Sequence, residues 1–167
     1  MTYDWILFAI LFLALWSAII AGVFSAFSEF IMSGLLRSEP AAGIEAMQQI
    51  NRTVIKTQFV AGILLIPFIS VALAIYALPA FHGTARAMLI AAPIVYVTTV
   101  FLMTLFGNVP MNNKLAALDP HDADTETYWR DYGRKWTRLN HLRSVGSIVT
   151  AGLYGAAAIA LVASGQV

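Results

Sequence analysis

The side chains best able to do chemistry gather in one polar segment, Asn108 to Arg143, of an otherwise apolar chain. The segment contains the runs NVPMNNKL and YWRDYGRKWTRLNHLRS. Amides and indoles donate hydrogen bonds, and a guanidinium binds anionic oxygen. Together they suit the stabilisation of an oxyanion on a small molecule. We therefore expect any function of the chain to reside in this segment.

The second half of the segment separates into two faces when it is read as a helix. At about 100° per residue, one face spans an arc of about 80° and contains Trp129, Gly133, Trp136, Asn140 and Arg143. A basic row lies about a third of a turn away, with Arg130, Arg134, Arg138 and His141. The first face predicts a binding surface. The second suits anionic lipid headgroups, so a surface role is the commoner interpretation of His141 and a site role the alternative.

The first half of the segment is a turn rich in amides. Gly107, Asn108 and Pro110 predict that the third apolar helix ends here. A short helix over 111–118 should follow, and Asp124 should cap a helix that continues into the last apolar segment. Asn108 and Asn112 are either ordinary turn formers or donors aimed at a bound polar group.

Two residues outside the segment are expected to join it. Glu29 lies about 36 Å along the first helix from Trp5, which places it near the membrane boundary and at the depth of Arg143. An ion pair between them, structural or catalytic, would satisfy both charges. Ser38 and Pro40 predict the start of a helix in the first loop, with Asn51 on its less polar face beside Trp136.

The composition sets the fold class. The chain is 59% hydrophobic with a mean hydropathy of +0.75, too apolar for an ordinary soluble domain. Four segments reach the roughly 20 residues that a spanning helix needs, at about 5–36, 57–78, 85–107 and 145–163. We expect an all-α integral membrane four-helix bundle, a single domain over 1–167, with cytoplasmic juxtamembrane helices.

The distribution of Lys and Arg predicts the orientation. The first and third loops together carry every Lys and Arg except Arg86, which lies in the second loop. The positive-inside rule therefore predicts a multi-pass protein of the cell membrane, with the first and third loops cytoplasmic and both termini outside. No basic residue precedes the first apolar run, so we expect that run to be retained rather than cleaved.

Several classes of function receive little support. The chain has no cysteine and three scattered histidines, His82, His121 and His141, which do not match a metal-ligand spacing. Nucleotide and dinucleotide fingerprints are absent from the sequence. The basic row adjoins the membrane, so we expect no nucleic-acid partner, and we expect neither a metal nor another cofactor.

The runs GVFSAFSEFIM, MQQINR, NVPMNNKL and YWRDYGRKWTRLNHLRS resemble the anthrone-oxygenase-like integral membrane family over nearly the whole chain. The resemblance implies a four-helix membrane bundle, and fungal relatives oxidise anthrones to anthraquinones. The charged Glu29 departs from the family pattern. The positions that match the pattern are Asn108, Pro110, Asn112, Trp129, Trp136, Asn140 and Arg143.

The leading hypothesis is an oxygenase for a flat, phenolic or enolisable molecule at the cytoplasmic membrane face. Such a site needs a base, donors around an oxyanion and a dry aromatic slot. Trp129, Trp136 and Asn51 would bind the substrate, and Arg143 would hold the phenolate. The donors would be Asn108, Asn112 and Asn140, and the base Glu29 or His141.

Two other hypotheses stay open. A non-catalytic membrane protein would hold a lipid, a quinone or a partner helix in the same pocket. A small transporter is less supported, because no charged residue lies clearly at mid-membrane. The expected partners are a bilayer with anionic headgroups and a small aromatic or lipid-like ligand. Whether copies of the chain form a homo-oligomer is left open by the sequence.

Overall fold

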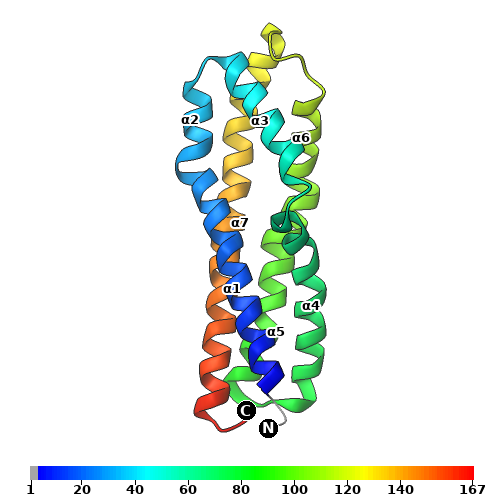
Figure 1. The fold of residues 1–167 in the computed structure, drawn as a ribbon, viewed down its shortest axis with the longest axis vertical. Helices are drawn as coiled ribbons and strands as arrows, with labels where there is room; N and C mark the ends of the chain where they lie inside the picture. Colours follow the sequence, from blue (N-terminus) through cyan, green and yellow to red (C-terminus); the bar gives the residue numbers. More distant parts are fainter. Residues whose placement is uncertain (1–3) are drawn as a thin grey trace.

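The computed structural model describes residues 4–167, and within that range every regular element is helical. The residues Met1 to Tyr3, which bear on the expected retention of the N-terminus, lie outside the described range. The long helices run side by side in an elongated bundle (Figure 1). The elements are α1 (Asp4–Ala26), η1 (Phe27–Ile31, a π-helical turn), α2 (Met32–Arg37), α3 (Pro40–Val54), α4 (Gln58–Ala80), α5 (Gly83–Tyr96), η2 (Val97–Phe101, π-helical), η3 (Thr104–Asn108, π-helical), α6 (Val109–Ala116) and α7 (Ala123–Ala163).

Four helices are long and apolar enough to cross a membrane, which confirms the predicted all-α membrane bundle. They are Trp5–Arg37, Gln58–Ala80, Gly83–Ala116 and Ala123–Ala163. At 1.5 Å per residue three of them measure about 50 to 60 Å, well beyond a hydrocarbon core of about 30 Å. Only α4, with 23 residues, matches the bilayer. The other three therefore extend beyond it.

The helix α3 lies above α4 in the bundle (Figure 1). It takes the place of α4 in the part of the bundle that extends beyond the bilayer. This change of helix divides the interior into two cores. The larger core packs apolar side chains of α1, α4, α5 and α7, such as Ile10, Ile63, Leu89 and Leu161. The smaller core, which we call the upper core, contains Met32, Ile44, Met47, Leu115, Trp129, Tyr132 and Trp136. The two cores meet where α3 ends and α4 begins.

The ends of the helices agree with the predicted topology. The start of α1, the end of α7 and the α4–α5 connection share one end of the bundle (Figure 1). There the backbone N–H of His82 donates to Oε1 of Gln166 at 3.0 Å. The α2–α3 and α6–α7 connections lie toward the opposite end (Figure 1). The cytoplasmic assignment of that opposite end remains a prediction.

The local boundaries differ from the prediction at three points. The third long helix does not end at Gly107–Pro110 but continues to Ala116. Pro110 is accommodated because the π-helical turn η3 directly precedes α6 and already departs from the α-helical bonding that proline would break. Glu39, not Ser38, precedes α3. Asp122, not Asp124, caps α7 by accepting a hydrogen bond from the N–H of Asp124 at 3.2 Å. The uninterrupted α7 is confirmed, whereas the predicted separate helix over 111–118 corresponds to α6, the last part of the third long helix.

Gly146 of α7 packs tightly against the third long helix. A Cβ atom at this position would overlap the hydroxyl of Thr99 in η2. Thr99 itself is fixed by donating to the carbonyl of Val95 at 2.7 Å. Gly152, two turns further along α7, has open space instead. Glycine at 146 thus sets the separation of the two helices.

We predict that Gly146→Ala lowers the free energy of unfolding by about 1–3 kcal/mol, because the added methyl group overpacks this crossing. The matched variant Gly152→Ala should be neutral or more stable, since alanine favours a helix by up to about 1 kcal/mol. Denaturant unfolding in detergent micelles measures both. A Gly146→Ala protein as stable as Gly152→Ala would show that the crossing is looser than described.

Candidate functional site

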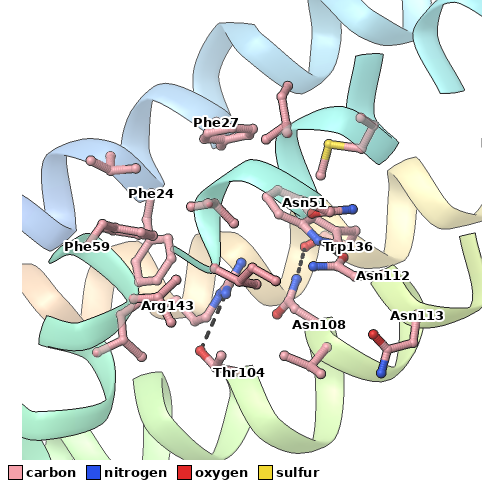
Figure 2. Close-up of a pocket in the computed structure, with 18 of the residues that line it drawn as sticks. Phe24, Phe27, Asn51, Phe59, Thr104, Asn108, Asn112, Asn113, Trp136 and Arg143 are labelled. Carbon is pink, nitrogen blue, oxygen red and sulfur yellow. Dashed lines mark hydrogen bonds between the residues drawn. The ribbon is translucent and has the colours of Figure 1, made fainter. Parts of the chain in front are cut away.

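A cavity of about 430 Å³ lies at the junction of the two cores. Its size falls within the range of small-molecule sites. Its walls come from five parts of the chain and are mostly apolar (Figure 2). The first long helix supplies Phe24 and Phe27, and α4 supplies Phe59. The polar members of the wall are Asn51, Arg52, Thr104, Asn108, Asn112, Asn113, Trp136 and Arg143.

Arg143 places a guanidinium against this cavity although the side chain is only 5% exposed. Its Nη2 donates to Oδ1 of Asn140 at 2.7 Å and its Nη1 to Oγ1 of Thr104 at 3.4 Å. The group also lies over the rings of Phe24 and Trp136, at 4.3 and 5.3 Å from their centroids. Cation–π contacts of this kind favour a cation but do not neutralise it.

The charge of Arg143 has no carboxylate partner. None of the ion pairs found among residues 4–167 includes it, and its Nε atom is buried without a hydrogen-bond partner. A buried cation held only by neutral oxygens and ring faces carries a desolvation cost. A ligand anion in the cavity would offset that cost. An anionic oxygen placed in the cavity would interact favourably with this charge.

Asn140 holds the guanidinium in place from behind the cavity wall. Its Nδ2 donates to the carbonyl of Phe24 at 2.6 Å and to Oγ of Ser28 at 2.7 Å. Because the nitrogen of the amide faces these two oxygens, Oδ1 must face Arg143. Ser28 belongs to the π-helical turn η1. Asn140 therefore acts through Arg143 and does not itself line the cavity.

A second polar group lies at the end of the cavity nearest the upper core. Oδ1 of Asn112 accepts from the hydroxyl of Tyr132 and from Nε1 of Trp136, both at 2.9 Å. These two bonds fix the amide and leave its Nδ2 available as a donor. The neighbouring Asn108 donates from Nδ2 to the carbonyl of Trp136 at 3.3 Å (Figure 2). Two cavity-lining amides thus have defined orientations.

Several polar atoms of the wall are buried without partners. They are Nδ2 of Asn51, Oδ1 of Asn108 and Nε of Arg143. Each such group costs about 1–3 kcal/mol when it is left unpaired. The three unpaired atoms are two donors, on Asn51 and Arg143, and one acceptor, on Asn108.

The tryptophans of the predicted binding face have different positions. Trp136 lines the cavity, whereas Trp129 lies in the upper core. Between them Tyr132 stacks on both rings, with centroid separations of 5.5 Å to Trp129 and 6.4 Å to Trp136. Trp129 therefore supports the cavity wall through the stack. Its predicted contact with substrate is not supported by this position.

The structure brings together five of the predicted site residues on the cavity wall, namely Asn51, Asn108, Asn112, Trp136 and Arg143. Asn140 and Trp129 lie directly behind them. Trp129, Gly133, Trp136, Asn140 and Arg143 are all buried, as the helical periodicity predicts. The predicted basic row is exposed, including His141.

The predicted ion pair between Glu29 and Arg143 is wrong. Glu29 is exposed, whereas Phe24 and Ser28 of the first long helix contact Arg143 and Asn140 of α7. The π-helical turn that contains Glu29 changes which side chains face the bundle. Neither Glu29 nor His141 lines the cavity, and the wall contains no other Asp, Glu or His. Residues 4–167 also contain no group of three metal-ligating side chains.

Sequence reasoning did not single out Tyr132, Thr104 or the phenylalanines. Tyr132 projects about 60° from Trp129 on the helical wheel, beside the predicted face, so its signal was present. Thr104 lies one turn before Asn108 and shares its side of the helix. Phe24 and Phe27 carry no signal, because they cannot be distinguished from lipid-facing side chains in an apolar helix.

A family model described as anthrone oxygenase matches residues 52–153, more than half of the chain. The match includes Asn108, Asn112, Trp136, Asn140 and Arg143, whereas Phe24, Phe27 and Asn51 precede it. Neither the curated proteins nor the solved structures gave a match.

We predict that Asn140→Ala lowers the free energy of unfolding by about 2–3 kcal/mol, because it leaves a buried guanidinium and the hydroxyl of Ser28 without their partner. The control is His141→Ala, which removes an exposed neighbour and should change stability by less than about 0.5 kcal/mol. Denaturant unfolding in micelles provides the comparison. Equal stabilities for the two variants would contradict the supporting role of Asn140.

Proposed function

We propose, since the chain belongs to the anthrone oxygenase family, that it uses O2 to oxidise a flat phenolic or enolisable small molecule. The reaction would take place in the cavity beside Arg143, at the cytoplasmic face of the membrane. The observation that carries the proposal is a buried, unpaired guanidinium in an aromatic, mostly apolar cavity. The family gives the reaction type, and the cavity indicates how the substrate is held.

Arg143 would act by favouring the ionised substrate. A cation within a few ångströms of an acidic group lowers the pKa of that group, and the effect increases in an apolar environment. No Asp, Glu or His lines the cavity to act as a proton acceptor. We therefore propose that the substrate loses its proton to water and is bound as its phenolate or enolate.

Ionisation prepares the substrate for O2. In an anthrone, loss of a methylene proton gives an electron-rich anion. Transfer of one electron to O2 gives a substrate radical and superoxide, which combine to a peroxide anion at the former methylene carbon. This anion takes up a proton from water, which balances the proton lost at ionisation, and becomes a hydroperoxide. Loss of water from the hydroperoxide leaves a carbonyl group. Overall one CH2 group and one O2 become one C=O group and one H2O.

The remaining cavity residues would orient the substrate and stabilise the moving charge. Phe24, Phe27 and Trp136 provide ring faces for a flat molecule and limit the access of water. Nδ2 of Asn51 would donate to the substrate, and Oδ1 of Asn108 would accept from a substrate hydroxyl. Preorganised donors of this kind favour the transition state because they need no reorientation during the reaction.

The lack of a proton acceptor on the wall also favours a second candidate function. In this alternative the chain binds a lipid, a quinone or a partner helix in the same cavity and catalyses nothing. A ligand that stays bound through purification, together with no O2 consumption above the uncatalysed rate, would support it.

We predict that Arg143→Met lowers kcat/KM for O2 consumption with an anthrone by at least about 100-fold, the scale expected for loss of a main oxyanion-stabilising group. Its free energy of unfolding should stay within about 1 kcal/mol of wild type, since the variant removes a buried charge that lacks a counter-ion. The rate of O2 consumption is measured with an oxygen electrode on proteoliposomes. The rate with empty liposomes is subtracted to correct for spontaneous oxidation.

The matched control for this measurement is Arg138→Met, which removes an exposed cation from the same helix. It should retain wild-type kinetics. The proposal fails if the wild-type protein consumes no O2 above the empty liposomes, or if Arg143→Met is as active as Arg138→Met.

A further inference from the structure

The cavity is open on the side where α3 and α4 face the segment formed by η3 and α6. Leu64 of α4, Leu105 of η3 and Val109 of α6 line the cavity and are nevertheless 41%, 37% and 37% exposed. A side chain that meets both these conditions lies at the mouth of a cavity. We call this opening the lateral window.

The window is closed above by a contact between α3 and α6. Nε2 of Gln48 donates to the carbonyls of Leu115 and Leu118, at 2.9 and 3.0 Å. Gln48 is buried, and Leu115 belongs to the upper core. The bundle is packed at this contact, and below it the exposed residues Arg52, Asn113 and Ala116 line the upper part of the opening.

The window is closed below by a contact between α4 and η2. The rings of Phe68 and Phe101 pack edge to face, with centroids 6.3 Å apart. Pro67 and Ile66 of the same turn are buried in the bundle. The opening therefore extends from the last turn of α3 to about the second turn of α4.

The surroundings of the window are suited to lipid. Leu65 and Phe106, the chain neighbours of two window residues, are 57% and 75% exposed. Leu64 lies six residues into α4, about 9 Å from the start of that membrane-spanning helix. Arg52 and Asn113 line the cavity on the α3–α6 side, where an arginine can reach the headgroups. The apolar body of an amphipathic molecule in the leaflet would contact apolar side chains at the window, and its polar group would lie near the guanidinium of Arg52.

We propose that the cavity takes its ligand sideways from the membrane through the lateral window, and that the ligand class is flat, bilayer-dissolved molecules with one anionic oxygen. This proposal rests on the proposed function in one respect, namely that the cavity is the ligand site. The apolar body enters between Leu64 and Leu105, and the anionic oxygen reaches Arg143. Substrate reaches the site without leaving the bilayer.

Kinetics separate an entrance from a binding contact. A group that only narrows the route slows entry and release by the same factor, so the Kd stays constant. A group that contacts the bound ligand changes the Kd. Leu64→Trp and Leu105→Trp narrow the window from its two sides. The controls are Leu65→Trp and Phe106→Trp, which place the same ring on neighbouring exposed positions outside the cavity wall.

The probe is anthracene-9-carboxylate, a flat fluorescent anion that the proposed reaction does not consume. The probe is preloaded into phosphatidylcholine–phosphatidylglycerol vesicles containing the protein, and its anisotropy reports binding. Dilution into empty vesicles gives the release rate. We expect Leu64→Trp and Leu105→Trp to slow entry and release at least tenfold with a Kd within twofold of wild type. The two control variants should behave as wild type.

Unchanged rates in both window variants, or a changed Kd with unchanged release, would overturn lateral entry. Failure of the wild-type protein to bind the probe would overturn the ligand class. Window-dependent binding without O2 consumption would keep the lateral entrance and reject the oxygenase. Turnover by the wild-type protein, together with unchanged entry and release rates in the window variants, would keep the oxygenase and reject the lateral entrance.

Discussion

The arrangement of this protein depends on one buried guanidinium. Arg143 is held next to an apolar cavity by an amide oxygen, a threonine hydroxyl and two ring faces, with no carboxylate beside it. Such a charge is costly in a membrane protein unless a ligand or partner shares it. The neighbouring irregular helices supply these contacts, because η1 contributes Ser28 to Asn140 and η3 contributes Thr104. Two π-helical turns, η1 and η3, thus carry side chains that the site uses.

The cavity follows from the lengths of the helices. Three long helices extend beyond the bilayer, whereas α4 does not, and the short helix α3 takes its place in the upper core. Because α3 and α4 are separate helices, side chains do not fill the junction completely. Unpaired polar atoms of Asn51, Asn108 and Arg143 remain there. These unpaired atoms lower the free energy of unfolding, as is usual where a binding site is built into a packed fold.

The sequence was sufficient for features that depend on local patterns. Hydropathy identified the four spans, and helical periodicity separated the buried face of Trp136, Asn140 and Arg143 from the exposed basic row. Features that depend on irregular backbone were not predictable in this way. Glu29 was expected to face Arg143, but it lies on a π-helical turn that directs Ser28 toward α7 instead. Phe24 belongs to the site only because the packing of the first long helix places its ring under the guanidinium.

The central claim is that Arg143 makes the cavity a receptor for an anionic oxygen. The most direct test is a spectral titration of 2-hydroxyanthraquinone, whose phenolate absorbs in the visible, bound to the protein in micelles. A cation beside the hydroxyl favours the phenolate, so the pKa of the bound phenol should fall at least about one unit below its value in empty micelles. A bound pKa equal to or above the value in empty micelles would contradict the claim.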